Sequence, residues 1–581
     1  MENLNRIWNF SSKFDFLFKR IVPKQFKFNR SKLMQKIILL IFILLSQAIF
    51  SASKITETEK LAVTCKVWGF LKYYHPEVAG GKVNWDDQLL EKLPKIEKAQ
   101  TEEEFSLILE NWIDELGPVK EIAPIATPKE VKFFDKNFDL NWFNDKLFSK
   151  KLSKKLKFIE ENRFQTTEEF GPDFDGFKNY KNYFDLNYNT KDSRILMLFT
   201  YWNVIEYFFP YKYAMDQKWD NTLKQSLPLI SSAKNSDEFL LAMKKMLTHL
   251  NDGHVMFHIY PTEETAQIPL YFPATGKIID EKLVVTEILG DSLAEAYDIK
   301  IGDVITKIND KSIKDCIEEN RDLISASNGA LFLNKVVNPI LTSYSENVKV
   351  EFLKDGKSEI KKMIWFNYHD SHRNQFKKGA LKKKDKFKLL DNNIGYVNMG
   401  EIKKRNISEM IEALKATKSI VFDLRNYPKT TFKEISDFIN PKEERFAIYT
   451  YPYLNYPGKY EWKEGVKAGF DNKNNYKGKV IVLVNEDSFS QSEWTAMSFQ
   501  TSGNTTIIGS QTAGTDGNVF EFDFRGFHTG FSGIGVYYPD GRETQRIGII
   551  PDIEIKPTIK GIQEGKDEVL DRALLFIETG K

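Results

Sequence analysis

One stretch of sequence occurs twice in this chain, and this repeat limits the possible folds more than any other feature. Trp202 lies 134 residues after Trp68, and the same offset aligns Pro210 with Pro76. Without a gap it also aligns Trp85-Asp86 with Trp219-Asp220, Leu93-Pro94 with Leu227-Pro228, Phe105 with Phe239, and Leu116 with Leu250. Similarity at one fixed offset indicates a structural unit that is present in two copies.

Each copy is expected to be helical. Apolar residues recur at helical spacing, at Leu61, Val67-Trp68 and Leu71 in the first copy and at Met197, Tyr201-Trp202 and Ile205 in the second. The prolines should end the first helix, and the second should begin near Trp85 or Trp219. We interpret the aromatic stripes as core. The predicted copies span residues 54–117 and 191–262, joined by a long, partly irregular connection at 118–190.

Composition excludes several classes of function. A chain of 581 residues is too long for one core, so several domains are expected. With 83 basic and 81 acidic residues, the net charge of +2 predicts no nucleic-acid partner. Cys65 and Cys316 are interpreted as two buried free thiols, although one bridge between them remains an alternative. No Cys/His cluster has metal-ligand spacing, so neither a metal nor another cofactor is predicted.

Residues 1–53 are interpreted as a signal or an N-terminal anchor. Lys36 precedes the apolar run at 37–50, and the small residues Ser51, Ala52 and Ser53 follow it. This pattern is typical of a secretory signal, and the run is shorter than the roughly 20 residues of a spanning helix. We expect translation to start at Met34 and the protein to be periplasmic or secreted, with an uncleaved anchor as the alternative. No other membrane contact is predicted.

Residues 263–368 have the pattern of a small β-domain. Residues 282–288 alternate apolar and polar side chains as a half-buried strand does, and residues 348–352 and 361–365 are further strands. Residues 301–313, IGDVITKINDKSI, resemble a stretch of PDZ domains. Such domains add a peptide as a strand and bind its C-terminal carboxylate, which implies a polypeptide partner. A β-domain that only packs against its neighbours is the alternative.

Residues 385–575 are expected to form an α/β layer. Apolar strands are predicted at 393–398, 419–423, 479–484 and 506–508, and a helix at 490–500. Valine and isoleucine runs bounded by turns indicate buried parallel strands with crossover helices. The fold class is therefore multidomain α+β: a duplicated helical region, a PDZ-like β-domain and a C-terminal α/β core.

Ser490 lies at the junction of an apolar strand and a helix. A helix N-terminus offers unpaired amides and the positive end of a dipole, so a nucleophile and an oxyanion site can be built together there. By itself such a serine is more often only an N-cap.

Several separated stretches resemble one family in their order along the chain. They are Leu250–His254 (LNDGH), residues 420–428 (IVFDLRNYP), Ser490–Glu493 (SQSE), Gly509–Gly514 (GSQTAG) and residues 540–553, from Asp540-Gly541 to GIIPDI. Together they resemble the S41 peptidase superfamily, which contains C-terminal-processing (tail-specific) and tricorn-like serine proteases. The resemblance covers roughly residues 190–575. It implies a ClpP/crotonase-like core and a serine nucleophile at Ser490.

Departures from the family pattern indicate the subtype. Thr515 stands where C-terminal-processing proteases carry the lysine of their Ser-Lys dyad. His254 is then the implied general base, as in the Ser-His-Glu tricorn-like members, since imidazole titrates near neutrality. The implied third group is Glu543. Gln545 could occupy that position instead, with Glu493 or Asp252 as the acid.

The resemblance also implies an oxyanion hole made by the backbone amides of Gln491 and Lys429. Lys429-Thr430 replace the family's Gly-Gly pair, which puts glycine-only conformations in question. The leading hypothesis is an exported serine endopeptidase that cuts unfolded or C-terminally presented polypeptides. The alternatives are a peptide- or ligand-binding protein that has lost hydrolysis and a purely structural scaffold.

Overall fold

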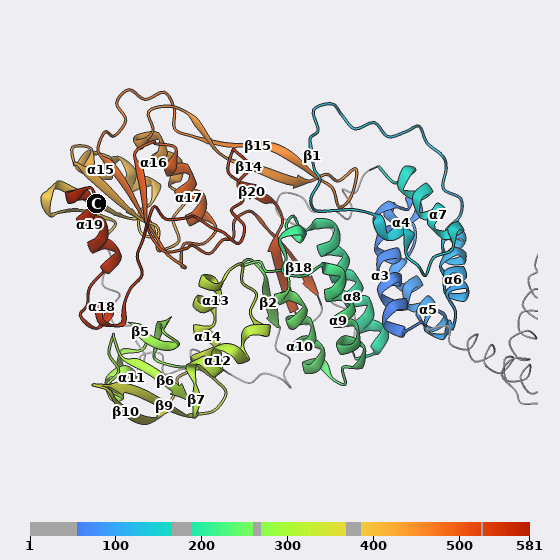
Figure 1. Ribbon diagram of the computed structural model, residues 1–581, viewed down its shortest axis with the longest axis horizontal. Coiled ribbons are helices and arrows are strands. Elements are labelled where there is room, and N and C mark those ends of the chain that lie inside the picture. The colour runs from blue at the N-terminus through green and yellow to red at the C-terminus, as the bar shows by residue number, and fades with distance from the viewer. Residues whose placement is uncertain (1–54, 166–188, 260–268, 368–384, 525–526) are drawn as a thin grey trace, which may run out of the picture. The chain divides into compact units, whose positions relative to one another are not determined.

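The computed structural model describes residues 55–165, 189–259, 269–367, 385–524 and 527–581, whose helices and strands are labelled in Figure 1. The predicted signal or anchor at 1–53 lies outside these residues. Among the helices of the described part, none is long and apolar enough to cross a membrane.

The helical region contains the same helices twice. In the first copy these are α3 (Glu57–Tyr74), α5 (Trp85–Lys98) and α6 (Glu102–Glu115), with the short α4 (Pro76–Ala79). In the second they are α8 (Lys191–Phe208), α9 (Trp219–Ser232) and α10 (Ser236–Thr248), with the 3₁₀ turn η2 (Lys212–Ala214). The three long helices of the second copy each begin 134 residues after their counterparts. As predicted, α3 and α8 end just before Pro76 and Pro210.

A reciprocal pair of indole hydrogen bonds joins the first two long helices in each copy. The indole of Trp68 donates to the carbonyl of Trp85 at 3.3 Å, and Trp85 donates to the carbonyl of Trp68 at 2.9 Å. In the second copy Trp202 and Trp219 exchange the same bonds at 3.1 and 3.0 Å. All four side chains are buried. The tryptophans therefore form core, as expected.

The helices α3 and α8 pack closely at a glycine. A Cβ placed on Gly69 would lie 1.8 Å from Oδ1 of Asn203, so only glycine fits there. The Asn203 side-chain amide donates to the carbonyls of Cys65 at 3.0 Å and of Phe199 at 2.9 Å. Both cysteines of the chain are free thiols; Cys65 is buried, whereas Cys316 is only half-buried.

The described part of the connection between the copies, residues 118–165, combines irregular chain with a few regular elements. It contains β1 (Phe133–Phe134), η1 (Asn141–Asn144) and α7 (Lys150–Glu161). The helix α7 begins at the N-cap Ser149, and it buries Leu152, Leu156 and Ile159, spaced three and four residues apart. The strand β1 pairs with β15 (Tyr460–Ala468).

A small antiparallel sheet occupies the region that the sequence predicts as PDZ-like. Its order is β10-β9-β6-β5-β4, with β7 beside β6. The strands are β4 (Ala274–Ile279), β5 (Lys282–Ile288), β6 (Val304–Ile308), β7 (Lys311–Ser312), β9 (Asn347–Lys354) and β10 (Lys357–Ile364). The helices are α11 (Asp291–Ala296), α12 (Ile313–Glu319), α13 (Gly329–Lys335) and α14 (Val337–Ile340), and β3 (Leu270–Tyr271) pairs with β8 (Thr342–Ser343). The strands expected in this region are all present.

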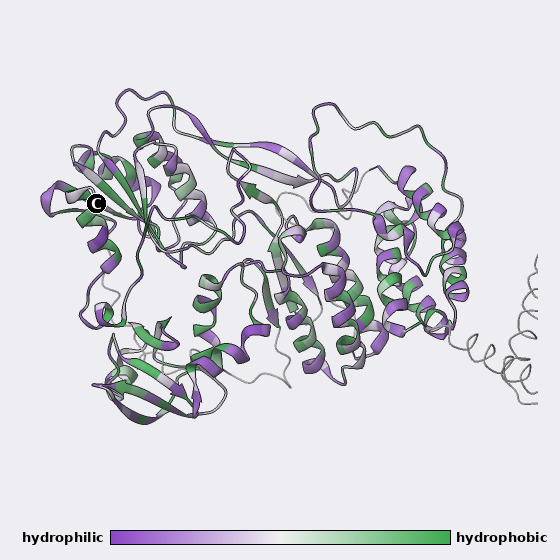
Figure 2. Ribbon diagram, viewed as in Figure 1, coloured by the Kyte–Doolittle hydropathy of each residue, from purple (hydrophilic) through white to green (hydrophobic). Residues whose placement is uncertain are grey.

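The C-terminal part is built on a second sheet, of order β11-β12-β13-β16-β17-β21. Its strands are β11 (Phe387–Leu390), β12 (Ile394–Asn398), β13 (Ser419–Asp423), β16 (Lys479–Val484), β17 (Thr505–Gly509) and β21 (Ile553–Glu554). All neighbours from β12 to β21 are parallel, as predicted. Figure 2 shows these strands mainly in the green of hydrophobic residues.

Helices cover this parallel sheet. They are α15 (Ile407–Leu414), α16 (Phe432–Ile439), α17 (Gln491–Gln500) and α19 (Glu568–Thr579), whereas the short α18 (Ile559–Gln563) contacts Gly302 of the small β-domain through Gln563. The helix α19 places Val569, Ala573 and Ile577 in one apolar cluster with Ile481 and Ile508 of the strands. This packing buries the strands that end at the predicted nucleophile.

Two further antiparallel sheets were not predicted. The strand β14 (Glu444–Pro452) lies between β15 and β20 (Gly535–Tyr537). The strand β19 (Phe527–Ser532) lies between β18 (Val519–Phe524) and β2 (Met256–Ile259). Because β2 directly follows the Leu250–His254 stretch, this sheet joins the end of the helical region to the C-terminal part.

Replacing Trp202 tests the duplicated core. The change Trp202→Ala should lower the free energy of unfolding of the helical region by about 3–5 kcal/mol, since it removes a fully buried indole and its hydrogen bonds. Urea denaturation followed by circular dichroism measures this loss. The control is Leu229→Ala on α9. Leu229 is 52% exposed, so this change should alter the free energy of unfolding by less than about 0.5 kcal/mol. Equal losses in both variants would contradict the assignment.

Candidate active site

Ser490 sits on a strained turn between β16 and α17. Its backbone has φ +52° and ψ −110°, in a region that residues with a Cβ rarely adopt. Such strain costs about 1–3 kcal/mol and persists only where surrounding contacts hold it. The serine is half-exposed, whereas Ser492 and Glu493 just after it are buried. The hydroxyl therefore lies at the N-terminus of a helix and within reach of solvent.

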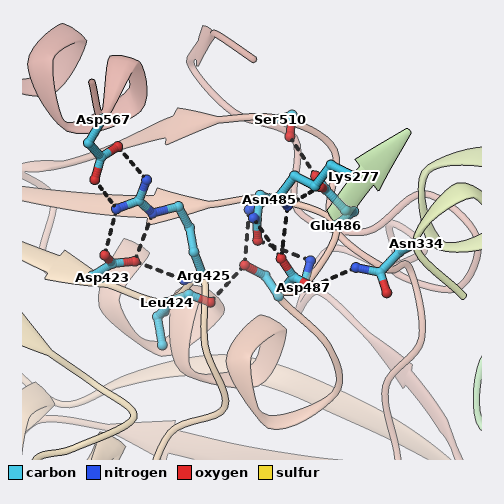
Figure 3. Close-up of polar contacts among 11 residues, drawn as sticks. Lys277, Asn334, Asp423, Leu424, Arg425, Asn485, Glu486, Asp487, Ser510 and Asp567 are labelled. Carbon is cyan, nitrogen blue, oxygen red and sulfur yellow. Dashed lines mark hydrogen bonds and ion pairs between the residues drawn. The ribbon is translucent and has the colours of Figure 1, made fainter. Parts of the chain in front are cut away.

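The turn before Ser490 is braced from two sides, as Figure 3 shows. The Ser488 hydroxyl donates to the carbonyl of Leu424 at 2.8 Å, which ties the turn to the end of β13. From β4, the Lys277 ammonium contacts the carboxylates of Glu486 and, at 3.1 Å, Asp487. The small sheet is thus bonded directly to the turn that leads into the nucleophile.

A charged network fixes the loop after β13. The Arg425 guanidinium donates to Asp423 at 2.7 Å and to Asp567 at 2.6 Å (Figure 3). Although burial opposes it, hydrogen bonding to both carboxylates raises the pKa of Arg425 above its usual range. Further along this loop Lys429 is exposed, and Thr430 has φ +58°. A threonine therefore adopts the left-handed conformation that the Gly-Gly pair of the family would favour.

The Glu493 carboxylate organises the backbone around Ser490. It accepts hydrogen bonds from the amides of Gly514 at 2.8 Å, Thr515 at 3.0 Å and Ser490 at 3.3 Å, and from the Thr512 hydroxyl. Burial raises the pKa of Glu493 to about 7, against the effect of these hydrogen bonds. The carboxylate holds the loop 512–515 against the start of α17.

A second buried carboxyl lies next to this one. Burial, and then the charge of Glu493, raise the pKa of Asp516 well above its ordinary value. One oxygen of Asp516 accepts the Gly517 amide at 2.8 Å.

Thr515 connects the serine to the histidine motif. Its carbonyl accepts the amide of Ser490 at 3.0 Å, and its hydroxyl oxygen accepts the amide of Gly253 at 3.1 Å. A Cβ on Gly253 would lie 2.4 Å from that oxygen and 2.5 Å from Leu331, so the motif needs glycine here. Thr515 thus brings the turns that carry Ser490 and His254 to one place.

His254 contacts a serine that sequence reasoning did not identify. Its Nδ1 lies 2.9 Å from the hydroxyl oxygen of Ser532, which lies 2.9 Å from Oδ1 of Asp252. The other oxygen of Asp252 accepts the amide of Ser532 at 2.7 Å. The Phe489 ring packs edge-on against the imidazole at 4.9 Å. The nucleophile turn and the imidazole are therefore in van der Waals contact through Phe489.

Burial decides the charge of this histidine. It lowers the pKa of His254 to about 4; Lys335 also lowers it, whereas Asp252 opposes the shift. Burial likewise lowers the pKa of Lys335 to about 8. The Lys335 ammonium donates to the carbonyls of Gly253 at 2.6 Å and Ser325 at 3.0 Å. Near neutral pH the imidazole is uncharged and able to accept a proton.

The structure brings only some of the predicted catalytic residues into contact with one another. No hydrogen bond between Ser490 and His254 is present in the described part of the chain, so direct proton transfer between them stays a prediction. Glu543 instead accepts the Tyr213 hydroxyl at 2.7 Å and pairs with Lys136 at 3.5 Å; the described contacts do not join it to His254. The amide of Gln545, the alternative position, donates to Asp252 at 3.3 Å.

The start of α17 offers the amide of Gln491 to an oxyanion. The amides of Ser490, Ser492 and Trp494 donate to carbonyls within the protein. That of Gln491 donates to no acceptor among the described residues, and it follows the serine directly. A hydroxyl, a neutral imidazole and a free amide can together support acyl transfer. Within the described ranges no group of His, Cys, Asp and Glu could hold a metal ion.

Comparisons with known proteins relate part of this chain to peptidases. Residues 393–555 match the sequence model of peptidase family S41. The carboxy-terminal processing protease CtpA of Bacillus subtilis (strain 168) is 26% identical over 301 residues, which cover 48% of this chain and 56% of that protein. The chain thus matches little more than half the length of this curated relative.

Solved structures show a similar fold. Mature CPAF complexed with lactacystin has a TM-score of 0.54 at 12% identity, over 67% of this chain and 99% of that chain. A second crystal structure of mature CPAF has a TM-score of 0.53 at 12% identity and covers 67% and 98%. At this identity the likeness concerns the fold alone.

Removing the Thr515 hydroxyl tests the junction between the two turns. The change Thr515→Val leaves the Gly253 amide without its acceptor, so the free energy of unfolding should fall by about 1–3 kcal/mol. A matched control is Thr200→Val on α8, because that buried hydroxyl has no partner in the described structure. Its loss should be neutral or stabilising. Urea denaturation compares both with the wild type, and equal effects would show that the Gly253 contact contributes nothing.

Proposed function

Since this chain belongs to the S41 peptidase superfamily through residues 393–555, we propose that it is a serine endopeptidase. Ser490 attacks the scissile carbonyl, and His254 takes the serine proton and delivers it to the leaving amine. The bond between the carbonyl carbon and the nitrogen breaks, and water then hydrolyses the acyl-enzyme by the reverse proton path.

One observation carries this proposal: Thr515 bonds to both the Ser490 turn and the Gly253 turn. The serine and the imidazole come from stretches more than two hundred residues apart in the sequence, yet they share this buried residue. The low pKa of His254 supports its role, because a general base must be unprotonated at the working pH. Activity should therefore persist below the pH at which an ordinary histidine is half-protonated.

The oxyanion hole is proposed at the start of α17. The amide of Gln491 and the helix dipole would stabilise the negative charge on the tetrahedral intermediate. The second donor is proposed to be the amide of Lys429. The left-handed Thr430 beside it supports a loop shaped like that of glycine-containing relatives.

The substrate is proposed to be an unfolded or C-terminally presented polypeptide. Residues 263–368 are proposed to be a PDZ-like domain, supported by the small sheet that ends at the edge strand β4. A pocket of about 1250 Å³ lies along β4 and reaches α13 and Asp487, three residues before the nucleophile. A peptide bound beside β4 would thus lie near the turn that carries Ser490.

The remaining assignments are also proposals. The chain is divided into helical repeats at 54–117 and 191–262, the linker 118–190 and a ClpP/crotonase-like protease core at 385–575. The segment 1–53 would export the protein to the periplasm or the medium.

A second candidate function is peptide binding without hydrolysis. It is favoured by two observations: the described structure has no hydrogen bond between Ser490 and His254, and residues 429 and 430 are not glycines.

The change Ser490→Ala tests the nucleophile. Wild type should react with a fluorophosphonate probe and cleave casein, and the variant should lose the labelling and at least about 1,000-fold of the cleavage rate. Ser502→Ala, beyond the end of α17, is the matched control and should keep both activities. Tight peptide binding by a wild type that the probe does not label would support the second candidate instead.

Peptides with free and amidated C-termini test the tail-specific part of the proposal. Initial cleavage rates should be higher for the free carboxylate, because backbone amides of a PDZ-like site would bind it. The two peptides differ only at the terminal group, so composition cannot explain a difference. Equal rates would remove C-terminal recognition and leave the peptidase intact.

A further inference from the structure

We propose that Ser532 and Asp252 are the positioning residues of His254, in the role that the family resemblance implies for Glu543. Ser532 would hold the imidazole in one tautomer, and Asp252 would hold Ser532. The inference deepens the proposed function and rests on it, because it concerns how the base of that reaction is prepared.

The direction of the hydrogen bonds follows from the available protons. Both oxygens of Asp252 act as acceptors: Oδ2 accepts the Ser532 amide at 2.7 Å, and Oδ1 accepts the Gln545 side-chain amide at 3.3 Å. The Ser532 hydroxyl has one proton, and it donates that proton to Oδ1 of Asp252 at 2.9 Å. Toward Nδ1 of His254, 2.9 Å away, Ser532 can then only accept. The imidazole must carry its proton on Nδ1.

This tautomer is the one that general-base catalysis needs. With the proton on Nδ1, the lone pair lies on Nε2, where it can take the proton of Ser490. The imidazolium formed in this step keeps its bond to Ser532, and the charge of Asp252 lies one hydroxyl away. Ser532 retains its own proton throughout, and the transferred proton leaves Nε2 for the departing amine. The proton count therefore balances without another reactant.

Strand pairing sets the position of Ser532. In the antiparallel register of β19 with β2, Gly530 lies opposite Met256. Continuing that register by two residues brings Ser532 opposite His254. The hydroxyl is thus positioned by a backbone ladder, and both Ser532 and Asp252 are completely buried. Little freedom remains for the imidazole to turn.

Glu543 is occupied elsewhere. Its carboxylate accepts the Tyr213 hydroxyl at 2.7 Å and pairs with Lys136 at 3.5 Å. Two residues later, Gln545 contacts Asp252 in place of an acid. The negative charge near His254 therefore comes from Asp252, two residues before it in the Leu250–His254 stretch.

The first test reads the tautomer directly. Nitrogen-15 NMR of the full chain, with the signal of His254 assigned by its loss in His254→Gln, should show Nδ1 protonated and Nε2 unprotonated at pH 7. In Ser532→Ala this single tautomer should give way to a mixture. Protonated Nε2 in the wild type, or an unchanged spectrum in Ser532→Ala, would overturn the proposal. This readout needs no catalysis, so it remains valid if Ser490→Ala shows that the proposed function is wrong.

Kinetics supply the second test. Ser532→Ala should lower kcat for casein peptides by about 100-fold or more with little change in KM, because it forfeits most of the general-base contribution. Ser532→Thr retains a hydroxyl and should recover most of that loss. Glu543→Gln should remain within about 3-fold of wild type. A loss in Glu543→Gln that matches Ser532→Ala would overturn the proposal and restore the triad implied by the resemblance.

The pH profile separates positioning from general damage. The charged groups that act on His254 are Asp252 in its own turn and Lys335 from α13, and Ser532→Ala leaves both in place. Losing the acceptor at Nδ1 destabilises the imidazolium, so the pKa of His254 should fall. The acid limb of kcat/KM, where the base becomes protonated, should then move to lower pH. A limb that stays in place while kcat falls would indicate a structural effect and overturn the positioning role.

Discussion

The candidate site depends on the hydrogen bonds that the buried carboxylate of Glu493 accepts. The carboxylate accepts the amide of Ser490 together with three donors from the loop 512–515, so it binds the start of α17 to that loop. Burying a charge is unfavourable unless hydrogen bonds compensate for it, and here the backbone supplies most of them. The loop in turn supports the histidine turn through Thr515. Strain at Ser490 is tolerable because these contacts hold its amide from two directions.

The site is assembled from distant parts of the sequence. The serine follows a strand of the parallel sheet, whereas the histidine follows α10 and precedes β2. Their proximity requires Thr515 and the pairing of β2 with β19. Thr515, the residue at which the family resemblance implies the lysine of a Ser-Lys dyad, contributes a backbone carbonyl and an acceptor oxygen in this chain. If His254 is the base, as proposed above, the helical region supplies it and Thr515 only holds its turn in place.

Local sequence patterns were enough to predict the strands of the core and the repeated helices. The strands β5, β13 and β16 have the predicted bounds, because valine and isoleucine runs between turns define them without knowledge of the partners. The helix pairs were predictable from the constant offset of the repeat. The role of Ser532 was not predictable: it lies 278 residues from His254, and only strand pairing brings the two together. The helix α7 was missed because its short apolar stripe lies in a lysine-rich stretch.

The pairing of β1 with β15 has a consequence for the modularity of the protein. The segment between the two helical copies leaves them to supply an edge strand to a sheet of the C-terminal part. It returns through α7, and just after that helix Arg163 donates to the carbonyl of Asn455 at 2.9 Å. A gene fragment that began at the second copy would therefore encode β15 without the partner of its first residues, Tyr460 and Glu461, and would lengthen an open edge that can pair with other chains. The duplicated region and the C-terminal part therefore share one sheet, and a cut between the two copies would divide it.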